Sequence, residues 1–215
     1  MLRPYSGTSG VAAAQSNEGF LKMDHLALYD VLYIYKDTHK IVLDLAESLT
    51  DEQIRWKPAR YNLSIGFHLW HLARESDFLR ARFMELIPGL AAELGDEREI
   101  WAREELARKW EFPPDLDLGQ TGAGTGLSRS AAGSLPIPEK DELLDYLRRS
   151  YEAVEKFVEL LDACYPSFEE ADEDLKKKIQ NIRLNILVFL LHDGRHLGMA
   201  ECLKGLLTGK GTATA

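Results

Sequence analysis

Apolar residues recur at helical spacing in four long stretches of the chain. In residues 22–48 they fall at intervals of three, four and seven, which places them on one face of an amphipathic helix. They are Leu28, Leu32, Tyr35, Val42, Leu45 and Leu49. Comparable stripes run over about 64–87, 140–163 and from 172 or 175 to 207, and few segments alternate with the period of two that a half-buried strand needs. We therefore predict an all-α fold, a four-helix bundle.

Local signals mark where these helices begin and end. Thr50, followed three residues later by Gln53, has the form of a capping box and predicts a short helical turn that stops before Pro58. Ser64 can cap the second long helix, which Pro88-Gly89 would end. Gly209 follows the last stripe, where a helix would be released.

A long insert, about 89–139, separates the second and third long helices. Its first half is charged and predicts a short helix around Trp101, whereas its second half, 112–138, is rich in Gly, Pro, Ser and Thr. Loops of this length in a compact domain are usually functional covers or flexible segments. The run Gly122–Gly126 is not a phosphate-binding loop, because no strand precedes it and no Lys-Ser/Thr follows it.

Composition and charge narrow the class of protein. The net charge of −9 disfavours nucleic acid as a partner, and no window is apolar enough to cross a membrane. Two cysteines without a secretory signal predict free thiols in a reducing compartment, so we expect a cytoplasmic protein. We expect a disordered leader over 1–22, one domain over 23–208 and a flexible tail over 209–215.

Two histidines, His192 and His196, lie four residues apart inside the apolar run 179–207. On a helix both imidazoles project to one face and can reach one metal ion. Two imidazoles packed in such a run would otherwise need other polar partners, and spacing alone leaves both alternatives open. Helical geometry directs Cys202, Asp193 and Glu201 away from this pair.

An open catalytic metal site usually has three protein ligands, and the best third candidate is His71. His68, three residues earlier, can equally face the bundle interior. Glu75, four residues after His71, is either an acceptor that orients an imidazole or a solvated charge, and we favour the solvated charge. His25 and His39 have no partner at metal spacing and are interpreted as structural or exposed.

The order of these motifs resembles a known family. Leu49–Ile54, Trp56-Lys57-Pro58, the stretch from Leu63 to Leu72, and His192-x-x-x-His196-Leu197-Gly198 follow one another as in the DinB-like superfamily of four-helix bundles. That superfamily includes proteins linked to bacillithiol- and mycothiol-dependent reactions. The similarity extends over about 23–207, and the long insert resembles a subset of the family.

The resemblance implies a metal site made by His71, His192 and His196. It implies zinc or nickel, with iron as a further option, and water or substrate at the remaining positions. It also implies a homodimer.

The leading hypothesis is a metal-dependent enzyme, either a thiol S-transferase with a low-molecular-weight thiol as co-substrate or a hydrolase, acting on a small molecule. Candidate catalytic helpers are Glu75, Arg195 and Tyr29 or Tyr33, and the insert would close over the site. The alternative is a non-catalytic, dimeric metal-binding or stress-response protein with a structural metal. An iron-dependent oxygenase of the ergothioneine-synthase type would need a second domain.

Overall fold

The computed structural model describes residues 28–96, 98–119, 121–164 and 171–210, and these residues contain helices and no strand. The expected leader 1–22, His25 and residues 211–215 of the expected tail lie outside the described residues. The elements in chain order are α1 Leu28–Glu47, α2 Asp51–Arg55, α3 Ile65–Leu86, η2 Pro88–Leu90, α4 Ala91–Leu94, α5 Ile100–Arg103, α6 Leu106–Lys109, α7 Arg129–Ala132, α8 Lys140–Cys164 and α9 Glu173–Thr208.

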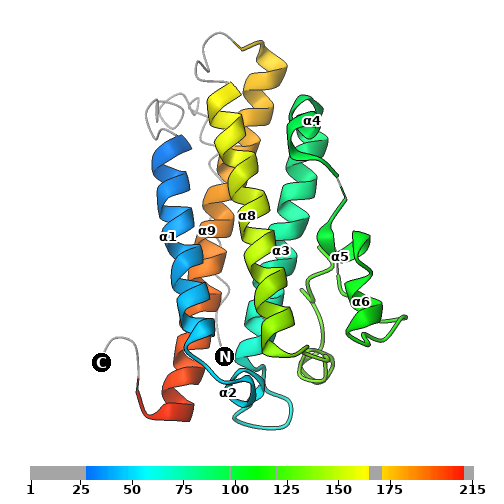
Figure 1. The fold of residues 1–215 in the computed structure, drawn as a ribbon, viewed down its shortest axis with the longest axis vertical. Helices are drawn as coiled ribbons and strands as arrows, with labels where there is room; N and C mark the ends of the chain where they lie inside the picture. The colour runs from blue at the N-terminus through cyan, green and yellow to red at the C-terminus, as the bar shows by residue number, and fades with distance from the viewer. Residues whose placement is uncertain (1–27, 97, 120, 165–170, 211–215) are drawn as a thin grey trace, which may run out of the picture.

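The four long helices α1, α3, α8 and α9 form the bundle (Figure 1). Helices α8 and α9 each pack against both α1 and α3, so that α1 and α3 are diagonal to each other. The short helices α4, α5 and α6 lie along the outer side of α3 (Figure 1). The predicted all-α bundle is therefore confirmed.

The helix ends follow the predicted signals. Ser64 Oγ accepts from the Phe67 amide at 3.1 Å, and Thr50 and Gln53 form the complete capping box. Asp172 caps α9 by accepting from the Leu175 amide at 2.8 Å, and Gly209 ends that helix with a positive φ of 71°. That backbone conformation favours glycine.

The bundle core has two apolar clusters with a buried polar layer between them. One cluster includes Leu45, Trp70 and Leu147, and the other includes Phe83, Phe157 and Ile182. Between them the helices bury a set of polar side chains: His39, His71, Arg74, Glu75, Ser76, Asp77, Ser150 and Asp193. Buried polar groups need partners, so this layer is where the chain's chemistry is concentrated.

A buried ion pair on α3, formed by Arg74 and Asp77, holds the insert against the bundle. Arg74 Nε donates to the Gly122 carbonyl at 3.1 Å, and another guanidinium nitrogen lies 2.8 Å from Glu99. Asp77 accepts from the backbone amides of Ile100 and Trp101, both at 2.9 Å. The predicted helix around Trp101 is present as α5. The second half of the insert also packs on the bundle, since Ala123 is fully buried. These contacts favour the interpretation of the insert as a cover.

Candidate metal centre

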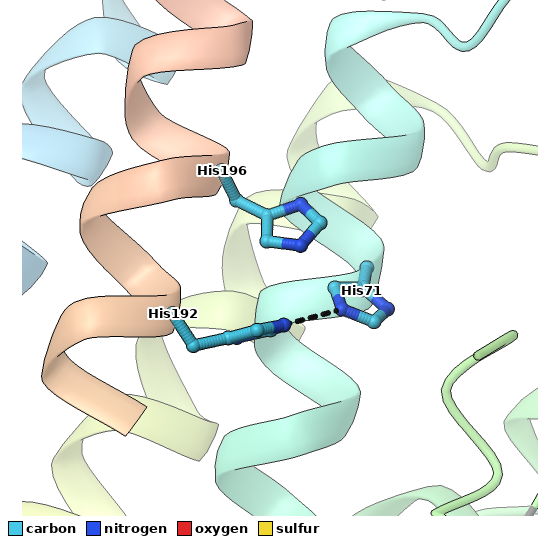
Figure 2. Close-up of side chains that lie close together, drawn as sticks. All are labelled: His71, His192 and His196. Atoms are coloured by element: carbon cyan, nitrogen blue, oxygen red, sulfur yellow. Dashed lines mark hydrogen bonds between the residues drawn. The ribbon is translucent and has the colours of Figure 1, made fainter. Parts of the chain in front are cut away.

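The fold brings His71 from α3 together with His192 and His196 from α9. One nitrogen of each imidazole lies within 4.8 Å of the other two, so this group can hold a metal ion. Nε2 of His71 is 3.1 Å from Nε2 of His192. Figure 2 shows the three rings converging in the space between the two helices.

This spacing is close to what a metal needs. Zinc–nitrogen bonds of about 2.0–2.1 Å with tetrahedral angles place two ligand nitrogens roughly 3.3 Å apart. The 3.1 Å between the His71 and His192 nitrogens is close to that value. The His196 nitrogen lies within 4.8 Å of both others. The three residues therefore fit a metal ion.

Burial favours the neutral form, which metals bind, in two of these imidazoles, His71 and His196. Burial, with a smaller effect from His71 and other nearby histidines, lowers the pKa of His196 to about 2. Burial also lowers the pKa of His71, although the Ala123 carbonyl and Glu75 act against it. A neutral imidazole has a free lone pair at physiological pH, which is the condition for ligation.

The insert fixes the tautomer of His71. The Nδ1–H group of His71 donates to the Ala123 carbonyl at 2.7 Å. In the neutral ring Nε2 then carries no hydrogen, and it is Nε2 that faces His192. A backbone group 52 residues away in sequence therefore orients this ligand.

Glu75 is buried beside the cluster, so the interpretation of this residue as a solvated charge was wrong. Only 5% of Glu75 is exposed, and its Oε1 lies 4.0 Å from Nε2 of His71. The same oxygen accepts from the hydroxyl of Thr121 at 2.9 Å and lies 3.5 Å from that of Thr125. Both threonines belong to the insert, which is why the local sequence around Glu75 gave no sign of burial.

His68 belongs to the neighbourhood of the site but not to the three-histidine group. Its Nδ1 lies 2.9 Å from Nδ1 of His196, so one proton shared between these atoms orients the His196 ring. Burial, together with His71, lowers the pKa of His68 to about 4. The sequence alone left His68 as an alternative to His71 on the interior face of the helix. The position of His68 about one helical turn before His71 was the feature of the sequence that could have indicated a place beside the cluster.

The structure does not place the other candidate catalytic residues, Arg195, Tyr33 and Tyr29, beside the histidine cluster. Arg195 is exposed and lines a surface cavity on α9 with Leu187, Leu190 and Leu191. Tyr33 is 67% exposed on α1. Tyr29 lies in the first turn of α1, and its side chain is outside the described part of the structure. Among these candidates, Glu75 alone is described as a neighbour of the cluster.

The two cysteines are free as predicted, but Asp193 lies closer to the histidine pair than helical geometry predicted, with its Oδ1 3.7 Å from Nδ1 of His192. Cys164 and Cys202 are free and exposed, as expected for reduced thiols. Asp193 is 1% exposed and faces His39, with its Oδ2 3.4 Å from Nε2 of His39.

No helix among the described residues is long and apolar enough to span a bilayer.

Comparison with known proteins identifies the family. The family model for the DinB superfamily matches residues 34–200, a span that contains all three histidines of the cluster. No curated protein shows significant similarity to the chain. The chain belongs to the DinB superfamily.

Proposed function

We propose that this DinB superfamily member is a metal-dependent enzyme, a thiol S-transferase or a hydrolase, in which His71, His192 and His196 bind a divalent metal. The observation that carries the proposal is the cluster itself, three imidazoles from two helices with one nitrogen of each within 4.8 Å of the others. Imidazole ligands suit zinc, nickel and iron, and we propose zinc or nickel. When bound, the metal supplies Lewis acidity that acidifies a water or a low-molecular-weight thiol.

The ligand set favours catalysis over a structural role. Structural zinc sites are usually closed by four protein ligands, whereas three leave a position for water or substrate. The three histidines contribute no negative charge, so the metal would keep its full charge. The His192 side chain is 28% exposed, which gives small molecules a route to that position.

We assign Glu75 as the general base. Its carboxylate lies within 4.0 Å of His71 Nε2 and is held by the Thr121 hydroxyl. In the transferase reaction the thiol S–H proton passes to Glu75, the sulfur bonds to an electrophilic carbon, and the leaving group departs with the bond's electron pair. In the hydrolase reaction Glu75 takes a water proton while the oxygen attacks a carbonyl carbon, and the leaving group then takes up a proton.

The insert has a double role in this proposal. It orients His71 through the Ala123 carbonyl, and it shields the α3 side of the site from water, since Ala123 is fully buried. A low-dielectric wall of this kind strengthens the interaction between Glu75 and a developing charge.

Metal analysis and paired activity assays test the proposal. Protein stripped with chelator and reloaded with zinc or nickel should bind about one ion per chain, and His71→Ala should lose most of it. Glu75→Gln should keep the metal and lose activity in assays that pair bacillithiol, mycothiol or glutathione with an electrophile, or that offer activated esters. Met199→Ala, exposed on the same helix as His192 and His196, is the matched control and should retain both.

Two outcomes would count against the proposal. Full metal content in His71→Ala would show that the metal does not bind at the three-histidine cluster. A loaded protein that is inactive in every assay, but melts far lower with chelator, would establish the non-catalytic alternative with a structural metal.

We also propose that two copies associate through α1 and α9. These helices leave a set of large apolar side chains exposed: Ile34, Ile41, Leu184, Leu187, Val188 and Leu191. Exposed apolar side chains at this density are typical of interaction surfaces. Light scattering should give twice the monomer mass, and Leu187→Glu with Leu191→Glu should give the monomer. A wild-type monomer at micromolar concentration would contradict the dimer.

A further inference from the structure

A buried carboxylate lies directly behind the metal-facing part of α9. Asp193 follows His192 in sequence and is 1% exposed, on helix α9, which packs against α1 and α3. Its Oδ1 lies 3.7 Å from Nδ1 of His192, and its Oδ2 lies 3.4 Å from Nε2 of His39. The carboxylate therefore sits between two imidazoles, one of which belongs to the candidate metal site.

His39 anchors this carboxylate from the opposite side. Its Nδ1 lies 2.6 Å from Oε1 of Glu155 on α8, and its ring stacks on Tyr151 with the centroids 3.6 Å apart. Burial opposes charge on this ring, but the carboxylates of Asp193 and Glu155 beside it raise the pKa of His39 overall. A charged His39 would offset the negative charge of buried Asp193.

The remaining polar atoms of this group lack partners among the described residues. Nδ1 of His192 and both carboxylate oxygens of Asp193 are buried without a hydrogen bond. A buried acceptor without a donor is costly, so such atoms usually indicate a partner or a second state of the site.

The position of the ring hydrogen on His192 explains why His192 and Asp193 are not hydrogen-bonded in this arrangement. His71 gives its Nδ1–H to Ala123, so its Nε2 is an acceptor, and the 3.1 Å contact with His192 needs a hydrogen on Nε2 of His192. In the neutral ring of His192, Nδ1 is then bare, and a bare nitrogen does not bond to a carboxylate. A metal on Nε2 would displace that hydrogen and leave Nδ1–H facing Asp193.

In the other two histidines of the cluster, His71 and His196, the Nδ1 atom already has a hydrogen-bond partner. Nδ1 of His71 has the Ala123 carbonyl at 2.7 Å, and Nδ1 of His196 has His68 at 2.9 Å. Nδ1 of His192 lacks such a partner among the described residues, and the Asp193 carboxylate is an acceptor 3.7 Å away from it. Metal-bound histidines almost always donate their second N–H to an acceptor of this kind.

We infer that Asp193 is a positioning residue for the metal site, which accepts a hydrogen bond from Nδ1–H of His192 once a metal occupies Nε2, while His39 and Glu155 hold the carboxylate in place. This inference rests on the proposed metal-binding function. It gives a role to the buried residues Asp193 and His39, which the reaction itself does not use. It also links the metal site to Glu155, whose side chain is 18% exposed.

A purely structural role for the same residues makes a different prediction. If Asp193 only formed a buried ion pair with His39 that fixes how α1 packs on α9, its removal would lower stability and leave zinc affinity in the folded protein unchanged. Measurements on folded, zinc-loaded protein therefore separate the two roles.

Zinc affinity is the first measurement, made by competition with a chromophoric chelator. Asp193→Asn keeps the shape but removes the charge, and it should weaken zinc binding by about 10- to 100-fold. Asp174→Asn, an exposed aspartate on the same helix, is the matched control and should bind as the wild type does. His39→Gln should weaken binding less, because Asp193 remains.

Histidine ¹H–¹⁵N spectra of the zinc-loaded wild type provide a readout that does not depend on a variant folding. The Nδ1–H proton of His192, assigned with His192→Gln, should be shifted downfield and protected from exchange, as expected for donation to a carboxylate. In Asp193→Asn it should move upfield, while the Nδ1–H of His71, bonded to Ala123, should stay in place.

An exposed, rapidly exchanging Nδ1–H on His192 in the wild type, or unchanged zinc affinity in folded Asp193→Asn, would overturn the assignment of Asp193. Failure of the wild type to bind zinc or nickel at all would instead overturn the proposed function.

Discussion

The two sides of the histidine cluster are built differently. On the α3 side, His71 is 5% exposed and its Nδ1 is bonded at 2.7 Å to the insert. On the α9 side, the His192 side chain is 28% exposed and its Nδ1 has no hydrogen-bond partner among the described residues. One ligand is therefore oriented before any metal arrives, and another is free to adjust.

This difference follows from what covers each helix. Helix α3 packs against α8 and α9 and is also covered by the insert, so even its polar residues Arg74, Glu75 and Asp77 are buried. On helix α9 the described part of the insert makes no such cover over His192, whose side chain is 28% exposed. We interpret the α3 side as the fixed half of the site and the α9 side as the half through which metal and substrate enter.

The largest expected effect comes from removing one ligand on each side. Both His71→Ala and His192→Ala should lose more metal affinity than the ~10- to 100-fold typical of changes to groups behind the ligands. Because His71 is preorganised, its loss should be the more severe of the two. Zinc competition titrations of both variants check this order, and equal losses would remove the distinction between the two sides.

Arg74→Leu should give the next largest effect, because Arg74 joins the insert to α3. Its loss leaves the Gly122 carbonyl without its Arg74 donor and buried Asp77 without its cationic partner, and breaking a buried ion pair costs about 3–5 kcal/mol. Urea unfolding measures this loss, and limited proteolysis should show cleavage within the insert. Arg82→Leu, an exposed change on the same helix, should be nearly neutral. An insert that stays protected in Arg74→Leu would show that other contacts hold it.

Acid should destabilise the metal-free protein through both sides of the cluster. In the fold, burial lowers the pKa of His68 to about 4 and that of His196 to about 2, from an ordinary 6.5. Above pH 6.5 these residues are neutral in both states and contribute nothing. Below it the unfolded chain takes up protons that the folded protein does not, so stability falls from pH 6.5 towards pH 4 and below. His39, whose pKa is raised, acts in the opposite direction.

Urea unfolding of chelator-treated protein at pH 7.5 and 5.5 checks this prediction. The free energy of unfolding should be lower at pH 5.5, and His68→Gln and His196→Gln should each reduce the drop. A drop that is the same in wild type and in both variants would assign the acid sensitivity to other groups.

The smallest predicted effect concerns the hydrogen bonds that hold Glu75. Thr121→Val removes the donor at 2.9 Å from Oε1 and should cost about 1 kcal/mol or somewhat more. Thr125→Val removes a contact at 3.5 Å and should cost less. Thermal melts of both variants measure the difference, with zinc affinity expected to stay within about threefold. The reverse order would mean that Thr125 is the main donor.

The sequence predicted the elements well because their signals are local. The stripe of apolar residues and the caps at Ser64 and Asp172 act within a few residues, and α3 and α9 begin next to them. The His192–His196 spacing likewise depends on a single helix. The third member, His71, came from the family resemblance and not from spacing.

The surroundings of the site were not predictable in the same way. Ala123 acts through a backbone carbonyl, which has no side-chain signature, and it lies 52 residues from His71. The burial of Glu75 depends on how the insert docks. His39 was interpreted as structural or exposed, and its contact with Asp193 becomes visible only when α1 packs on α9.

A crystal structure of the zinc-loaded protein, with anomalous data at the zinc edge, tests the central claim most directly. We predict one strong peak per chain, bound by Nε2 of His71, Nε2 of His192 and one nitrogen of His196, with the His71–Ala123 hydrogen bond unchanged at about 2.7 Å. A peak away from these three histidines, or none at stoichiometric zinc, would contradict the account.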